Sequence, residues 1–146
     1  MTVDEILNEW DKDSVVDPLH IEEGLANISR LHAKYLRLWA IASREATLIE
    51  IDLKNFIQLK TCWYGPEGLS KEELTDLGWE PRPKVVIRLD MERYLDGDQE
   101  VIKKKLRFAS AKLKVNKLTF ILKEINNRNW HYSRIIELRK FEAAIN

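Results

Sequence analysis

The feature that most constrains the fold is an apolar seam running from about residue 18 to residue 64. Its members recur at alternating steps of three and four residues, the spacing of a helix that packs lengthwise on another helix. No proline interrupts the seam after Pro18, and Gly65-Pro66 ends it. We therefore predict one long helix, or two nearly collinear ones, with Asp17 as N-cap and Pro18 at the first helical position. The seam comprises Leu25, Ile28, His32, Tyr35, Trp39, Ala42, Ala46, Ile49, Leu53, Phe56, Lys60 and Trp63.

So long a helix has a consequence for assembly. The chain has 146 residues, the size of one common domain, and its 45% apolar content suffices for a core of its own. We nevertheless expect that one subunit cannot bury the whole seam. Self-association is therefore the default expectation.

The remaining elements are predicted from turn and capping signals. Residues 65–83 are rich in glycine and proline and form a connection, with one helical turn capped by Ser70 and Glu73. The β-branched run 84–88 predicts a short extended element, and Asp96-Gly97-Asp98 predicts a turn that caps a helix over residues 98–126. Asn126-Asn127 predicts a break before a final helix over residues 132–144. The predicted fold class is mainly α: a long helical hairpin, with a short β element between the helices and a C-terminal helix.

Charge is unevenly distributed although the net charge is zero. Residues 1–24 carry eight acids against one base, whereas residues 101–123 carry eight bases and no acid. On a helix, four of these bases share one narrow stripe: Lys103, Arg107, Lys114 and Lys117. These bases either hold nucleic-acid phosphates or form a solvated or interfacial surface. Two apolar stripes of the same helix indicate contact with two neighbours; they are Ile102, Leu106, Ala109, Leu113 and Phe120, and Val101, Phe108, Val115 and Leu122.

Nothing in the sequence supports an enzyme, a cofactor or a metal. The glycine-rich motifs that cradle phosphates are absent, and the three histidines lack the spacing of metal ligands. Cys62 is the single cysteine, which excludes an internal disulfide. The N-terminal stretch is acidic and has no long apolar run, so we expect a soluble, intracellular protein with no membrane partner.

Two bases, Lys54 and Lys60, precede an aromatic pair, Trp63-Tyr64, at the end of the long helix. Aromatic rings at the edge of a basic surface stack on the bases of single-stranded nucleic acid, while lysines hold its phosphates. The alternative for Trp63 is packing against the core, which the spacing favours. Tyr64 either caps the helix or stacks on a base.

Three stretches of the chain carry a family resemblance. The first contains Lys60 and Trp63-Tyr64-Gly65, the second runs from Lys84-Val85 to Tyr94–Asp98, and the third runs from Ile125 to Ala143. By their order and spacing, the chain resembles the UvsY family of phage recombination mediator proteins over residues 35–144. Gln58 stands where relatives carry a second base, and Ala144 stands where a glycine is usual.

The resemblance implies a non-catalytic, mainly helical protein that assembles into rings in the cytoplasm of a phage host. Such proteins bind single-stranded DNA coated by a single-strand-binding protein, weaken that coat and help to load a RecA-like recombinase. It also implies that the base before the aromatic pair, here Lys60, contributes to DNA binding, and that the C-terminal helix drives self-association. The alternative is a helical structural or adaptor protein whose basic helix serves self-assembly or protein partners.

These expectations divide the chain into a DNA-binding domain, residues 1–127 with 65–97 as its connection, and a self-association helix, residues 128–146. The DNA-binding candidates are Lys54, Lys60, Trp63, Tyr64, Lys84, Arg88, Lys103, Arg107, Lys114 and Lys117. The self-association candidates are Trp130, Ile135, Ile136, Leu138 and Phe141.

Overall fold

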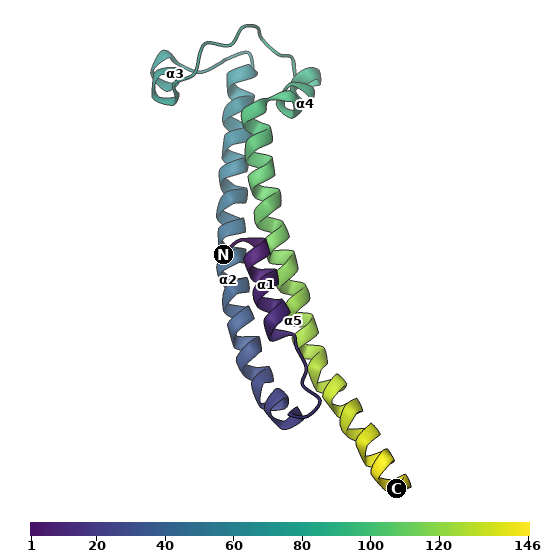
Figure 1. Ribbon diagram of the computed structural model, residues 1–146. Coiled ribbons are helices and arrows are strands. Elements are labelled where there is room, and N and C mark those ends of the chain that lie inside the picture. The colour runs from purple at the N-terminus through teal and green to yellow at the C-terminus, as the bar shows by residue number, and fades with distance from the viewer. The chain divides into compact units, whose positions relative to one another are not determined.

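The computed structural model describes residues 1–146 and is helical, as predicted (Figure 1). The helices are α1 (Val3–Asp13), α2 (Ile21–Tyr64), α3 (Lys71–Leu77), α4 (Arg88–Gly97) and α5 (Gln99–Ile145). No residue belongs to a β-strand. None of the helices combines the length and the apolar character that a membrane crossing requires.

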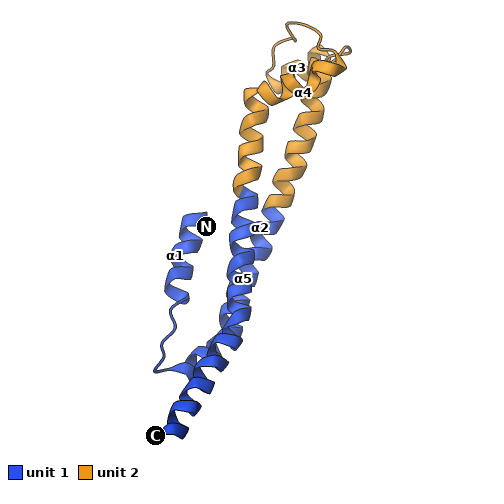
Figure 2. Cartoon of the chain, turned by 90° about the vertical axis from the view of Figure 1, so that its right-hand side faces the viewer, with its two compact units in different colours: residues 1–45, 111–146 blue, residues 46–110 orange.

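The chain forms two compact units, coloured separately in Figure 2. Unit 1 comprises Met1–Glu45 and Ala111–Asn146, and unit 2 comprises Ala46–Ser110. Unit 1 therefore holds α1, the first part of α2 and the last part of α5. Unit 2 holds α3, α4 and the remaining parts of the two long helices. Both long helices of the hairpin, α2 and α5, thus contribute to both units.

The predicted long helix is confirmed as α2, but it begins at Ile21 and not at Pro18. Asp17 closes a tight turn before it: one carboxylate oxygen accepts the Leu19 N–H (2.9 Å) and the other lies 2.6 Å from Nδ1 of His20. All twelve seam residues are buried or half-buried within the single chain. A second long helix, α5, is available inside the chain and covers the seam in part: four of its members are buried and eight are half-buried.

The core of unit 1 joins three helices. Ile6 of α1, Tyr35 of α2 and Leu118 of α5 belong to one cluster and are almost fully buried. The indole N–H of Trp39 donates to the Thr119 hydroxyl (3.1 Å), which adds a polar link between α2 and α5. Burial of this apolar surface is the main stabilising term for the unit.

Helix α1 was not predicted, although its first turn is strongly specified. Thr2 and Glu5 form a capping box, each side chain bonding the other residue's backbone N–H. Lys34 of α2 then holds two acids of α1, Glu9 at 2.9 Å and Asp13 at 2.6 Å. Burial alone would raise the pKa of the Asp13 carboxyl, but its hydrogen bonds with Lys34 and Tyr35 lower this pKa below the ordinary value. Part of the acidic N-terminal charge is thus neutralised inside unit 1.

Unit 2 confirms one predicted element and revises another. Helix α3 has the predicted capping box of Ser70 and Glu73, and it ends at Gly78, whose φ of 67° lies in the left-handed region that glycine favours. Arg88, the last residue of the predicted run 84–88, already belongs to α4. The run is not a strand, because no second strand lies beside it. Its one backbone hydrogen bond to α2 runs from the Val86 N–H to the Tyr64 carbonyl (3.0 Å). Helix α4 follows at once and was not predicted.

Helix α5 begins as predicted but does not break at Asn126-Asn127. Asp98 caps it, because its Oδ1 accepts the backbone N–H groups of Glu100 (3.0 Å) and Val101 (3.1 Å). The predicted break is absent because packing outweighs the weak helix propensity of asparagine there. Arg128 donates to the Ser14 carbonyl (2.5 Å), and Tyr132 is buried at 3% exposure.

The two apolar stripes of α5 differ in their exposure to solvent. Val101, Phe108, Val115 and Leu122 are buried or half-buried and face the rest of the chain. In the other stripe, Leu106, Leu113 and Phe120 are exposed at 65%, 46% and 62%. One stripe is therefore covered within the chain, and the other is open to a second neighbour.

Candidate nucleic-acid interface

The residues predicted at the end of α2 lie in one cluster within unit 2, with Lys60 at its centre. Lys60 is buried at 4% exposure. Its Nζ lies 3.2 Å from Oδ2 of Asp98 and 3.5 Å from Oε1 of Glu100. An ammonium group so buried is stable only when it is paired, and Asp98 supplies the pairing charge.

Three aromatic rings complete the surroundings of the Lys60 ammonium. Its Nζ lies 4.4 Å from the ring centre of Trp79, 4.7 Å from that of Trp63 and 5.8 Å from that of Phe56. All three distances fall within the range of cation–π attraction. Phe56 and Trp63 belong to α2, whereas Trp79 comes from the segment after α3, so the lysine joins two parts of unit 2.

Further aromatic contacts extend this cluster. Trp63 packs edge-on against Tyr64 (4.7 Å between ring centres) and against Trp79 (6.1 Å). Its indole N–H donates to the Glu80 carbonyl (2.9 Å). Tyr64 lies 5.9 Å from Tyr94 of α4. Trp63 and Tyr64 are half-buried. Trp63 therefore packs against other aromatic residues of unit 2, and both Trp63 and Tyr64 keep part of their surface exposed.

Asp98 receives hydrogen bonds from several sides. The Tyr64 hydroxyl donates to its Oδ2 (2.7 Å), and the α5 backbone N–H groups reach its Oδ1. Burial alone would raise the pKa of Asp98, but the hydrogen bonds from Tyr64 and Val101, together with Lys60, lower this pKa below its ordinary value. Burial and the bond to Asp98 raise the pKa of Tyr64. At neutral pH the cluster therefore holds a carboxylate at Asp98 and a neutral phenol at Tyr64.

Other predicted bases of unit 2 lie at its surface. Lys84, Arg88, Lys103 and Arg107 are exposed and form no ion pair. Lys84 is tied to the aromatic cluster, since its Nζ lies 5.9 Å from the ring centre of Tyr94. Lys54 is exposed too and forms a loose pair with Glu50 of the same helix (3.2 Å). Unlike Lys60, these side chains are exposed to solvent.

The basic segment 101–123 is only partly free of acids. Lys104 pairs with Asp52 (2.7 Å), Lys105 with Asp96 (3.2 Å) and Lys114 with Glu45 (3.6 Å). Lys117 is half-buried and unpaired. The acids that neutralise three of the bases come from other helices and could not be assigned to them from the sequence.

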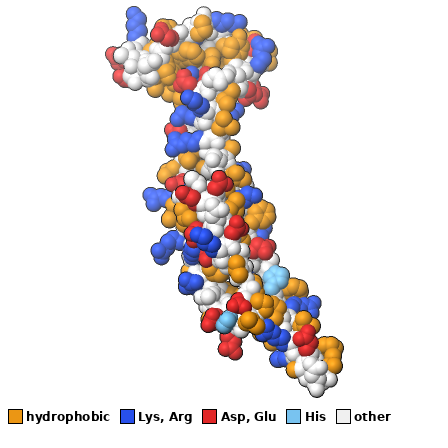
Figure 3. All heavy atoms as spheres, in the orientation of Figure 1, with side chains coloured by type: hydrophobic (Ala, Val, Ile, Leu, Met, Phe, Trp, Pro, Cys, Tyr) orange, Lys and Arg blue, Asp and Glu red, His pale blue; other side chains and the backbone are white.

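The predicted self-association residues lie on the last part of α5, where Figure 3 shows hydrophobic side chains at the surface. Trp130, Leu138 and Phe141 are exposed at 59%, 57% and 64%, whereas Ile135 and Ile136 are half-buried. Three large apolar side chains on one helix are thus without cover in the single chain.

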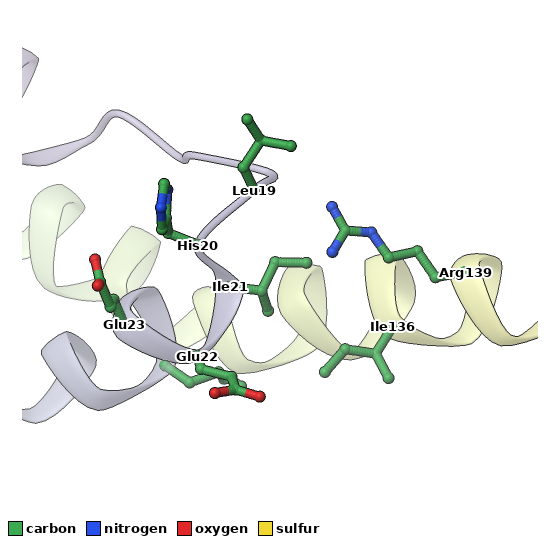
Figure 4. Close-up of a pocket in the computed structure, with 8 residues that line it drawn as sticks. Leu19, His20, Ile21, Glu22, Glu23, Ile136 and Arg139 are labelled. Carbon is green, nitrogen blue, oxygen red and sulfur yellow. The ribbon is translucent and has the colours of Figure 1, made fainter.

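Ile136 also lines a hollow of about 440 Å³ between the start of α2 and α5 (Figure 4). Arg139 extends from α5 toward the segment that carries Leu19, and it donates a hydrogen bond to the Pro18 carbonyl. This bond fixes the connection before α2 to the last part of α5.

Four residues of the cluster around Lys60 were not assigned to the site from the sequence: Phe56, Trp79, Tyr94 and Asp98. Phe56 carried a signal, because it precedes Lys60 by four residues on the same helical face. Trp79 lies in the predicted connection, where no periodicity indicates direction. Asp98 was predicted only as a helix cap.

Comparison with known proteins agrees with the predicted family. Residues 9–145 match the family described as UvsY, recombination, repair and ssDNA binding protein. No curated protein matches the chain in sequence.

Three crystal structures of the bacteriophage T4 recombination mediator protein UvsY share the fold at 20% identity. Lattice Type IV gives a TM-score of 0.84 and covers 97% of this chain and 99% of the T4 chain. Lattice Type I gives 0.82 (94% and 98%), and Lattice Type II gives 0.79 (98% and 98%). Because the family match extends over nearly its whole length, the chain belongs to the UvsY family.

Proposed function

We propose that this chain is an oligomeric single-stranded-DNA-binding recombination mediator without catalytic activity. It helps to load a RecA-like recombinase onto DNA that is coated by a single-strand-binding protein. The observation that carries the proposal, beside family membership, is the set of exposed bases of unit 2 that no carboxylate neutralises: Lys84, Arg88, Lys103 and Arg107.

Exposed lysine and arginine side chains that form no ion pair can contact the phosphate backbone of DNA. Each phosphate that a base neutralises releases counterions, so binding to a single strand weakens with salt at a slope of about 0.7 per phosphate. The half-buried rings of Trp63 and Tyr64 offer surface on which nucleotide bases stack. An assembly of several copies repeats these weak contacts, which then add by avidity.

Fluorescence anisotropy with a labelled oligonucleotide tests DNA binding. We expect strong binding at about 50 mM salt and a steep loss as salt rises. Lys103→Ala should reduce the salt slope, since Lys103 is exposed and unpaired. Lys105→Ala is the matched control, because Lys105 lies on the same helix but is already paired with Asp96. No binding at about 50 mM salt would refute the proposal.

Self-association is the second part of the proposal, and a second copy covers the exposed apolar side chains of α5. Leu138→Ser combined with Phe141→Ser should give smaller species in light scattering and native mass spectrometry, because both side chains are exposed in the single chain. Leu89→Ser serves as the control, since Leu89 is 91% exposed but lies in unit 2. This pair of substitutions is a cleaner test than deletion of residues 128–146, which would also remove Arg128 and its bond to Ser14. An unchanged mass would place self-association elsewhere.

The mediator role is tested with the coat protein and recombinase present. We expect the chain to shorten the delay before a RecA-like recombinase hydrolyses ATP on coated single-stranded DNA. On bare DNA, where there is no coat to weaken, the effect should be small. An equal effect on bare and coated DNA would contradict the loading role and leave DNA binding intact.

A helical adaptor without DNA affinity is the second candidate. The ion pairs of Lys104, Lys105 and Lys114 favour it, because they show that bases of the 101–123 segment meet acids of the chain itself. In that case the wild-type chain should show no DNA affinity, and Lys103→Ala should alter the mass of the assembly.

A further inference from the structure

We infer that Lys60 is a positioning residue: its ammonium fixes the rings of Trp63 and Trp79 and does not itself contact a DNA phosphate. The inference rests on the proposed DNA-binding function and assigns a different kind of role to the base that the family resemblance singles out. It follows from the burial, the partners and the connections of Lys60 within unit 2.

Burial is the first observation. The Lys60 side chain is 6% exposed, whereas that of Lys54, on the same helix, is 72% exposed. A phosphate that approached Lys60 would have to pass the surrounding rings or draw the ammonium out of them. Lys54 needs no such rearrangement.

The second observation is that the ammonium already has its partners. Asp98 and Glu100 lie within 3.5 Å of Nζ, and three ring faces surround the remaining sides. If Lys60 moved to a phosphate, the Asp98 carboxylate, itself 7% exposed, would be left without its counter-charge. A buried unpaired charge is strongly unfavourable, so the exchange opposes binding.

The third observation concerns what the lysine joins. Trp63 lies at the end of α2, Trp79 follows α3, and Asp98 caps α5. Asp98 also accepts a hydrogen bond from the Tyr64 hydroxyl. The Lys60–Asp98 ion pair therefore contacts both members of the predicted aromatic pair, Trp63 and Tyr64. Lys60 therefore sets the orientation of the rings that would stack on nucleotide bases.

The test compares Lys60→Met with Lys103→Met in anisotropy titrations over a salt series. Methionine keeps the length and apolar stem of lysine and removes its charge. Lys60→Met should weaken binding by roughly tenfold, about the contribution of one stacked base, and leave the salt slope unchanged. It should also shift the tryptophan emission, since the cation 4.4 and 4.7 Å from two indoles is gone. Lys103→Met should lower the slope and leave the emission unchanged.

Two further variants guard against simple misfolding. Lys60→Met combined with Asp98→Asn removes both buried charges, and it should recover part of the lost affinity because the only carboxylate left without its partner, that of Glu100, is exposed. Lys60→Arg keeps the cation and should bind more tightly than Lys60→Met. If circular dichroism shows that Lys60→Met alone is unfolded, the double variant is compared with the wild type in its place.

The outcomes separate the two proposals. If the wild-type chain binds and Lys60→Met lowers the salt slope by about 0.7 per contacting subunit with unchanged emission, Lys60 contacts phosphate and the inference is wrong. Unchanged affinity of Lys60→Met would also overturn it. If the wild-type chain does not bind, the proposed function fails and this role fails with it.

Discussion

Asp98 is the residue whose replacement should destabilise unit 2 most clearly. Its carboxylate combines two tasks. Oδ1 caps α5 by accepting two backbone N–H groups, and Oδ2 meets the Lys60 ammonium and the Tyr64 hydroxyl. Two substitutions separate the tasks, because asparagine keeps the cap acceptor and loses the charge, whereas alanine loses both.

The magnitudes follow from these contacts. Removing one partner of a buried ion pair costs about 3–5 kcal/mol. The lower end applies to Asp98→Asn, since Glu100 and three rings remain beside Lys60. Loss of an N-cap costs about 1 kcal/mol more. We therefore expect a loss in the free energy of unfolding of about 3 kcal/mol for Asp98→Asn and about 4 kcal/mol for Asp98→Ala.

Urea unfolding at a fixed protein concentration measures both losses. With a slope of about 1.5 kcal/mol per M, Asp98→Asn should lower the midpoint by about 2 M without changing the slope. Concentration is held constant because self-association would itself shift the midpoint.

The pH dependence of the free energy of unfolding is a second test of the Asp98 charge. Because the folded-state pKa of Asp98 lies below its ordinary value of 3.8, its stabilising effect is present above that value. The effect is lost as pH falls through the folded-state pKa. The difference between wild type and Asp98→Asn should therefore be full at neutral pH and shrink in strong acid. A difference that stays constant down to about pH 2 would refute the ionic account, and equal losses for Asn and Ala would refute the capping account.

Two smaller predictions concern unit 1. Gly24→Ala should lower the thermal midpoint although alanine favours helices by about 1 kcal/mol, because the added Cβ would lie 2.2 Å from the buried Tyr132 hydroxyl oxygen. Gly97→Ala is the control, since nothing lies within 4 Å of its added Cβ, and a stabilised Gly24→Ala variant would contradict the contact. Tyr35→Phe removes the hydrogen bond to Asp13 (2.9 Å) and should cost about 1 kcal/mol in urea unfolding. No change there would mean that Lys34 alone satisfies Asp13.

The sequence by itself determined the features that depend on neighbours along the chain. The seam, with its alternating steps of three and four residues, specified α2 and the face that it buries, because helical periodicity determines from the sequence spacing on which side of the helix each side chain lies. Ser70 with Glu73 specified the start of α3, and Asp98 the start of α5, because a cap bonds N–H groups only two or three residues away. The family was recognisable for the same reason, since its matching stretches are local patterns in a fixed order.

Only the tertiary structure decided which element covers the seam and where the charges lie. Helix α5 covers α2 inside one chain, and packing of Arg128 and Tyr132 carries α5 through Asn126-Asn127. Lys60 stood on the apolar seam, which was the one local sign of its burial. Its actual partners, Trp79 and Asp98, are distant in sequence, and a buried lysine is stable only once they are in place. Helical spacing fixes which way a side chain points, whereas the charge that meets it depends on segments that only folding brings together.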